Sequence, residues 1–324
     1  MTQPFVRPDV RRFLDYLETL PGPKMHEMDA PAARQVYHAM KDLADPPVGE
    51  LAVIRDLMVP GPAGDIPARL FDPRDGREPG SLVVFFHGGG FVIGNIETHA
   101  SFCAEMARVL DLPVVSVDYR LAPEHSWPAA PDDCEAAARW LAGAPVALGR
   151  AVTGLILAGD SAGGNLAIVT AMALRDRPAA APVIAHFPLY PATDASKPYP
   201  SYDEFAEGYL LTRDSMEWFM AAYQGDPAHL RSSPLIGDLA AMPPAVVVTA
   251  SLDPIRDQGR AYAAALIAAG VPTVFREAKG MIHGFANIRQ AIPSAKGDVA
   301  GALAALKAVL AEAEGERAMA QAAA

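Results

Sequence analysis

Short runs of apolar residues recur along this chain from about residue 50 onward, separated by stretches with helical periodicity. Each run is only four to seven residues long, which is typical of a buried β-strand rather than a helix. The runs span residues 52–58, 68–71, 82–86, 114–117, 154–158, 183–187, 245–250 and 271–277. Helices are expected between most of the later runs and after the last, over residues 101–110, 131–141, 165–175, 256–269 and 298–312. This alternation predicts an α/β fold with a mostly parallel, eight-stranded central sheet and helices on both faces.

Two segments depart from the alternation. Apolar residues recur at helical spacing over residues 8–20, which predicts an amphipathic helix before any strand. Residues 188–234 begin with a proline-rich stretch and continue with aromatic side chains among helix-forming residues. Each segment allows two interpretations, which are simple packing on the core and a cover over a binding site. The tail after Ala311 is rich in alanine and glutamate, and we expect it to begin as helix and then fray.

Composition narrows the class of protein. The chain has 324 residues, of which 51% are hydrophobic, so it can bury one large core. Its formal net charge of -11 argues against a nucleic-acid partner, because phosphate backbones bind surfaces rich in Lys and Arg. The N-terminus lacks the apolar region of a signal peptide, and no apolar run reaches the ~18 residues of a membrane span, so we expect a soluble, cytoplasmic protein. Cys103 and Cys134 are expected to be buried free thiols rather than a disulfide or metal ligands.

Two glycine-rich motifs follow predicted strands. GDSAG at residues 159–163 has the G-x-S-x-G spacing, in which a tight turn exposes a serine hydroxyl, here that of Ser161, as a nucleophile. HGGGF at residues 87–91 follows another strand, and its unobstructed backbone amides suit a loop that holds an oxyanion. Each motif is weak by itself, since an ordinary turn serine and a plain glycine bend would look the same.

An acid and a histidine complete the pattern. Asp253 follows the apolar run 245–250, and His283 lies about thirty residues further on, followed by a glycine. The chain order Ser, Asp, His is one in which a nucleophile, an orienting carboxylate and a general base form a catalytic triad. Asp257 is the rival for the acid position, and we favour Asp253 because it lies nearer the end of the strand.

With these motifs in order, the chain resembles the hormone-sensitive-lipase-like bacterial esterases, the family IV carboxylesterases of the α/β-hydrolase superfamily. The matching stretches are HGGGF at 87–91, DYRLAPEHSWPAA at 118–130, GDSAGGNLA at 159–167, DPIRDQG at 253–259 and HGF at 283–285. The resemblance supports Asp253 as the acid. We interpret the charged residues of the second stretch as a structural ion-pair network, and these are Asp118, Arg120 and Glu124.

The resemblance implies an α/β-hydrolase fold with a helical cap. The cap would comprise residues 1–45 and 188–234, and the catalytic core residues 46–187 and 235–324. Oxyanion donors would be the amide of Ala162, which follows the nucleophile, and those of Gly88 and Gly89. Many relatives pair as homodimers through an edge of the sheet, near the strand predicted here over residues 271–277.

The sequence therefore predicts a serine carboxylesterase for short- to medium-chain acyl esters of small molecules. Ser161 would form the acyl-enzyme, His283 would act as general base and acid, and Asp253 would orient it. No cofactor is expected, because the chain lacks a P-loop and an H-E-x-x-H motif and its eight histidines are scattered without ligand spacing. Two alternatives stay open, which are an amidase or deacetylase of small acylated metabolites and a non-catalytic ligand-binding protein on a hydrolase fold.

Overall fold

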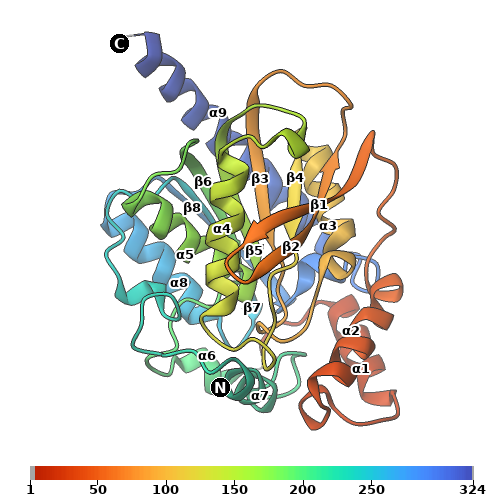
Figure 1. Ribbon diagram of the computed structural model, residues 1–324. Coiled ribbons are helices and arrows are strands. Elements are labelled where there is room, and N and C mark those ends of the chain that lie inside the picture. The colour runs from red at the N-terminus through yellow and green to blue at the C-terminus, as the bar shows by residue number, and fades with distance from the viewer. Residues whose placement is uncertain (1–3, 323–324) are drawn as a thin grey trace.

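An eight-stranded sheet forms the centre of the molecule (Figure 1). The computed structural model describes residues 4–322, so the outermost residues of the predicted segments 1–45 and 235–324 lie outside it. The strands are β1 (Val53–Gly61), β2 (Gly64–Asp72), β3 (Gly80–Phe86), β4 (Val114–Val117), β5 (Val152–Asp160), β6 (Val183–Leu189), β7 (Ala245–Leu252) and β8 (Thr273–Ile282). They lie in the order β1-β2-β4-β3-β5-β6-β7-β8, with β2 antiparallel to both of its neighbours and every other pair parallel. The predicted mostly parallel sheet is confirmed.

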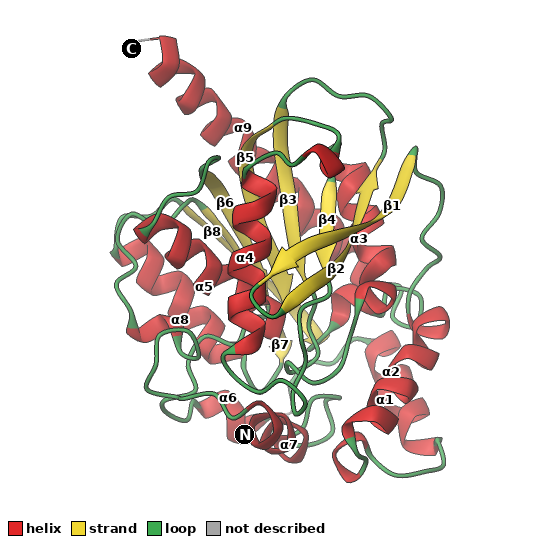
Figure 2. Ribbon diagram, viewed as in Figure 1, coloured by secondary structure: helices red, strands yellow, loops and turns green. Residues whose placement is uncertain are grey.

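Both faces of the sheet are apolar, and helices cover each of them (Figure 2). α3 (Ile96–Leu110) and α9 (Ala295–Ala322) pack on one face, and α4 (Ala129–Ala142), α5 (Ala162–Asp176) and α8 (Arg256–Ala268) pack on the other. In β3 successive side chains point to opposite faces, so Val83 and Phe85 join one buried cluster while Val84 and Phe86 join the other. A strand buried on both sides is apolar at every position, which is why such strands are visible in the sequence.

Four helices from two distant parts of the chain lie at the same end of the sheet (Figure 1). They are α1 (Pro8–Thr19), α2 (Ala30–Ala44), α6 (Pro200–Glu204) and α7 (Arg213–Tyr223). The helix predicted over residues 8–20 is confirmed as α1, whereas α2 was not predicted. The start of α2 nevertheless carries a signal, because the Asp29 side chain accepts a hydrogen bond from the Ala32 amide and a proline occupies the first turn.

Two helix boundaries differ from the sequence-based expectation. α3 begins at Ile96 rather than near residue 101, because Asn95 and Thr98 form a capping box ahead of the apolar stretch. α9 continues to Ala322, beyond the end expected at residue 312, so the tail after Ala311 begins as helix, as predicted, and stays helical through the described residues. Alanine and glutamate have high helix propensity, which lets α9 continue past its contacts with the sheet, and its last turns project from the body in Figure 1.

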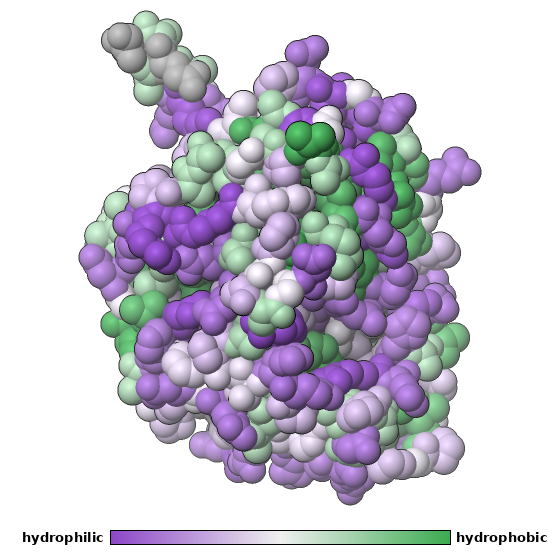
Figure 3. Space-filling model, viewed as in Figure 1, coloured by the Kyte–Doolittle hydropathy of each residue, from purple (hydrophilic) through white to green (hydrophobic). Residues whose placement is uncertain are grey.

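The surface and the cysteines give four smaller findings. Cys103 and Cys134 are free and buried, as predicted. On the face shown in Figure 3, hydrophobic residues form patches among hydrophilic ones. Among residues 4–322, no helix is long and apolar enough to cross a membrane. β8 is an edge strand with Phe275 partly exposed, and pairing of two copies there stays a prediction.

Candidate active site

Ser161 lies at the sharp turn between β5 and α5. Its backbone has φ 56° and ψ -117°, a conformation that residues other than glycine rarely adopt. This conformation holds the hydroxyl clear of both elements. The turn closes only because its neighbours are glycines. A Cβ on Gly159 would lie 2.2 Å from the carbonyl oxygen of Gly163, and a Cβ on Gly163 would lie 1.9 Å from that of Phe86. The G-x-S-x-G spacing is therefore a steric requirement of this turn.

We expect Gly163→Ala to lower the free energy of unfolding by at least about 2 kcal/mol, because the added methyl group must displace backbone atoms of β3. Urea unfolding followed by circular dichroism measures the effect. Gly315→Ala in α9 is the matched control, since a Cβ there meets no atom within 4 Å. This control should be neutral or raise the free energy of unfolding by up to about 1 kcal/mol. Equal losses in the two variants would contradict the steric argument.

The structure brings the three predicted triad residues together. His283 Nε2 lies 2.8 Å from Ser161 Oγ, and His283 Nδ1 lies 2.7 Å from Asp253 Oδ2. Asp253 is fully buried, and its second oxygen accepts a hydrogen bond from the Ile255 amide at 2.9 Å. With Nδ1–H donating to the carboxylate, Nε2 is left to accept the serine proton.

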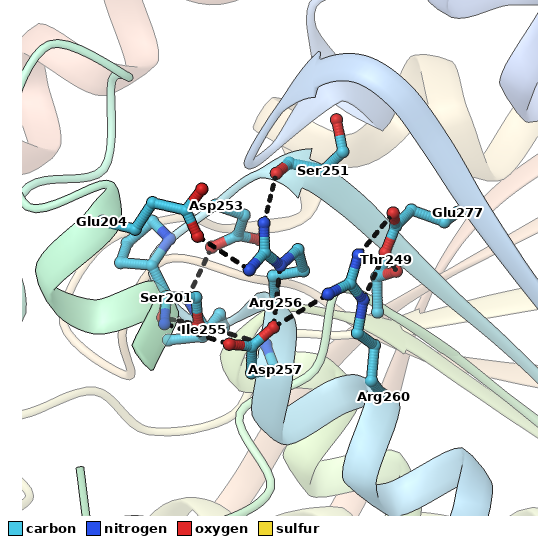
Figure 4. Close-up of polar contacts among 11 residues, drawn as sticks. Ser201, Glu204, Thr249, Ser251, Asp253, Ile255, Arg256, Asp257, Arg260 and Glu277 are labelled. Atoms are coloured by element: carbon cyan, nitrogen blue, oxygen red, sulfur yellow. Dashed lines mark hydrogen bonds and ion pairs between the residues drawn. The ribbon is translucent and has the colours of Figure 1, made fainter. Parts of the chain in front are cut away.

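Asp257, the rival acid, is used elsewhere. Its carboxylate accepts hydrogen bonds from the Ser201 amide at 3.0 Å and from Arg256 Nε at 2.8 Å (Figure 4). It also pairs with Arg260, on the next turn of α8. Asp257 therefore joins α6 to α8, whereas the carboxylate that reaches His283 is that of Asp253.

The predicted oxyanion donors need one correction. The Ala162 amide is the first of α5, where helical N–H groups have no partner within the helix, and Gly89 lines the cavity beside Ser161. The Gly88 amide instead donates to Asp160 Oδ1 at 2.7 Å, so it is not free to bind an oxyanion. Gly90, which sequence reasoning did not select, lines the cavity with Gly89. The run of three glycines was the available signal, but it did not show which amides face Ser161.

Comparison with known proteins fits this geometry. A family described by its alpha/beta hydrolase fold matches residues 83–287. The chain belongs to this family.

Its similar relatives are ester hydrolases. The chain is 36% identical to the carboxylesterase NlhH of Mycobacterium tuberculosis over 96% of this chain and 99% of that protein. It is 36% identical to an ethyl acetate hydrolase of Pseudomonas putida over 90% of this chain and 95% of that protein. The carboxylic ester hydrolase LipN of M. tuberculosis is 41% identical over 73% of this chain, which spans 65% of LipN.

Solved structures similar to this chain are also esterases or alpha/beta hydrolases. An esterase of Pyrobaculum calidifontis superposes with a TM-score of 0.85 at 37% identity, covering 94% of this chain and 98% of that one. An alpha/beta hydrolase enzyme from the metagenome of Lake Arreo gives a TM-score of 0.89 at 36% identity, covering 94% and 98%. This chain is thus a carboxylic ester hydrolase of the hormone-sensitive-lipase-like type, as the sequence motifs implied.

A cavity of about 1290 Å³ opens over Ser161 in this hydrolase, and residues of the N-terminal segment and of the segment 188–234 line it. Its mouth and walls include Met25 and Val36 from the N-terminal segment and Met216, Phe219 and Met220 from α7. Most of the lining is apolar, which suits an acyl chain or another apolar part of an ester. Within residues 4–322, no three His, Cys, Asp or Glu side chains gather in a group that could hold a metal ion.

Buried titratable groups surround the glycine-rich loop of the hydrolase. Burial lowers the pKa of His87 to about 3, so the ring stays neutral, and it stacks on Tyr119 with centroids 4.3 Å apart. Burial raises the pKa of Asp118 to about 6. Burial by itself would also raise the pKa of Asp160, but its interactions with His99 and with the Gly88 amide outweigh this effect and lower that pKa below the ordinary value.

Two of the three charged residues singled out in the DYRLAPE stretch, Arg120 and Glu124, form structural ion pairs. Arg120 forms two hydrogen bonds of 2.8 Å with the fully buried Asp133. Glu124 pairs with Arg34 of α2 at 2.6 Å. The ion pairs predicted for Arg120 and Glu124 are confirmed, while Asp118 lies 3.8 Å from His87 instead of beside a basic partner of the network.

Proposed function

We propose that this hydrolase cleaves short- to medium-chain acyl esters of small molecules through an acyl-enzyme on Ser161. The hydrogen-bonded line from Asp253 through His283 to Ser161, at the floor of an apolar cavity, is the observation that carries the proposal. The cavity volume of about 1290 Å³ is ample for such esters.

Acylation begins when His283 Nε2 takes the proton of the Ser161 hydroxyl as its oxygen attacks the ester carbonyl carbon. The carbonyl oxygen becomes an oxyanion, for which we propose the amides of Ala162, Gly89 and Gly90 as donors. The tetrahedral intermediate then collapses, the bond to the alcohol oxygen breaks, and the proton on His283 moves to the leaving alcohol.

Deacylation repeats these steps with water. His283 takes a proton from the water as its oxygen attacks the acyl carbon, and the second tetrahedral intermediate expels Ser161, which recovers its proton from His283. Asp253 stays ionised throughout, holds the imidazole tautomer and stabilises the imidazolium formed in each step.

We also propose that residues 1–45 and 188–234 act together as the cap of the active site. Helices from both segments lie at the end of the sheet that carries Ser161, and both contribute walls to the cavity. Apolar walls would bind the acyl chain and exclude water from the reacting carbonyl.

The test is hydrolysis of p-nitrophenyl acetate, butyrate, octanoate and palmitate, together with inactivation by diethyl p-nitrophenyl phosphate. We expect kcat/KM to peak at butyrate or octanoate and a diethylphosphoryl group to be found on the Ser161 peptide by mass spectrometry. A maximum at palmitate would contradict the proposed substrate class. Turnover of p-nitroacetanilide in preference to every ester would favour the amidase alternative.

Phe219 of α7 is expected to limit the size of the group beside the oxyanion loop. Its ring lies directly over Gly90, where an added Cβ would be 2.3 Å from two ring atoms. We expect Phe219→Ala to raise the ratio of kcat/KM for p-nitrophenyl pivalate over that for the acetate about tenfold, since pockets discriminate apolar groups by such factors. Trp218→Ala is the control, because this neighbouring aromatic residue does not line the cavity. An unchanged ratio in Phe219→Ala would show that the ring does not limit the site.

A further inference from the structure

Asp160, the residue before the nucleophile, is a buried carboxylate that the triad does not use. Only 3% of the residue is exposed. Its two oxygens have four polar neighbours. Oδ1 lies 2.7 Å from Gly88 N and 3.3 Å from His99 Nε2, and Oδ2 lies 3.2 Å from Asn287 Nδ2 and 3.4 Å from the Tyr190 hydroxyl.

These neighbours come from four different segments. Gly88 belongs to the oxyanion loop, His99 to α3, and Tyr190 follows β6. Asn287 lies four residues after His283, in the loop that carries the catalytic imidazole. A single carboxylate therefore contacts both loops that must meet at the reacting carbonyl.

The contact with the oxyanion loop is close as well as hydrogen-bonded. A Cβ on Gly88 would lie only 2.5 Å from Asp160 Oδ2, so the carboxylate packs directly against the backbone of this loop. Asp160 thus fixes the loop at Gly88, directly before the amides of Gly89 and Gly90.

The contact with the histidine loop is reinforced by Tyr190. Its hydroxyl donates to Asp160 and accepts a hydrogen bond of 3.3 Å from the Ala286 amide. The edge of its ring also meets the His283 imidazole, with centroids 4.8 Å apart. Asp160 and Tyr190 thus hold this loop at two successive residues, Ala286 and Asn287.

We propose that Asp160 is a positioning residue for ester hydrolysis, whose carboxylate sets the oxyanion loop and the His283 loop in register with Ser161. The proposal rests on the function given above. Oxyanion donors act only when they lie about 2.7–3.1 Å from the developing charge, and a misplacement of about 1 Å costs roughly 10²-fold in rate. The carboxylate accepts hydrogen bonds from Gly88, Asn287 and Tyr190 and lies at ion-pair distance from His99. An amide of the same shape offers only one acceptor oxygen and turns its N–H group toward other donors.

The experiment compares Asp160→Asn with the wild-type enzyme on p-nitrophenyl butyrate and on an alkyl trifluoromethyl ketone. The serine oxygen adds to the carbonyl carbon of the ketone, and the former carbonyl oxygen becomes an oxyanion. The inhibition constant of the ketone therefore reports how well the oxyanion donors and His283 are placed around this adduct. We expect kcat to fall about 10²-fold, KM to stay within about threefold, and the ketone to bind weaker by a factor similar to the loss in kcat.

Asp133→Asn is the matched control, because Asp133 is an equally buried carboxylate that serves only the scaffold pair with Arg120. It should lower the melting temperature while kcat and the ketone inhibition constant stay within about threefold. Tyr190→Phe is the second variant and removes only the hydroxyl. It should change kcat and ketone binding in the same direction, by about tenfold, and it decides the question if Asp160→Asn does not fold.

The proposal is overturned if the Asp160 and Tyr190 variants lose thermal stability but keep kcat and ketone affinity within about threefold. It is also overturned if Asp133→Asn shows the same selective loss. Failure of the proposed function has a different signature, since the ketone would then fail to inhibit the wild-type enzyme.

Discussion

Ser161→Ala is expected to lower kcat for p-nitrophenyl butyrate by at least about 10⁴-fold, leaving only the contribution of substrate binding and the oxyanion donors. The loss is large because the hydroxyl is the only part of this turn that can form the acyl-enzyme, and His283 Nε2 already lies 2.8 Å from it. Stopped or continuous assays at saturating ester measure kcat, with active-site titration to exclude contaminating wild-type enzyme. The alanine methyl group fits the same backbone, so the melting temperature should change little.

A companion variant tests whether the residues act as a unit. We expect His283→Ala to lower kcat by a similar factor. The double variant Ser161→Ala/His283→Ala should lower kcat little further than either single variant, because removing the nucleophile or its base already abolishes the same step. Losses that multiply in the double variant would mean that the two side chains act independently. Retention of the wild-type rate by Ser161→Ala would remove this serine as nucleophile.

The strands and the triad were predictable because their signals are local. A strand covered on both faces must be apolar throughout, so runs such as residues 82–86 stand out without knowledge of the fold. Ser161 and Asp253 follow strands whose ends are marked in the sequence, and parallel strands place their ends at one edge of the sheet. The strand before His283 was predicted to end at residue 277, whereas β8 continues to Ile282, directly before the histidine.

Helix α2 and the geometry of the glycine-rich loop were less predictable because their signals depend on the folded chain. α2 buries only the small residues Ala30, Ala33 and Ala44, and its larger apolar side chains stay at least partly exposed, so no run of large core residues marks this helix in the sequence. In the glycine-rich loop, Gly89 and Gly90 have φ of 116° and 59°, and these angles decide which amides face the cavity. The engagement of Gly88 by Asp160 joins residues 72 positions apart, which no local pattern reports.

The assignment of the acid makes the second large prediction. Asp253→Asn is expected to lower kcat about 10⁴-fold, because an amide opposite Nδ1 can hold the imidazole in the wrong tautomer and cannot stabilise an imidazolium. Asp257→Asn should keep kcat within about tenfold. It should instead lower the free energy of unfolding by about 1.5–3 kcal/mol, since Asp257 accepts from the Ser201 amide and pairs with Arg256 and Arg260.

The two variants are a matched pair, because Asp253 lies in the loop after β7 and Asp257 lies four residues on, at the start of α8. Their comparison therefore separates a catalytic role from a structural one. Steady-state kinetics give kcat for each, and urea unfolding gives the change in stability. The reverse result, a large loss of kcat in Asp257→Asn with Asp253→Asn nearly intact, would contradict the geometry at His283. Asp257→Asn can also change KM without changing kcat, because Asp257 anchors α6 to the start of α8, close after Asp253 (Figure 4). A loosened anchor would then raise KM, because α6 contributes Tyr202 to the cavity, while kcat stays near that of the wild-type enzyme. This pattern is opposite to the one expected for loss of the catalytic acid.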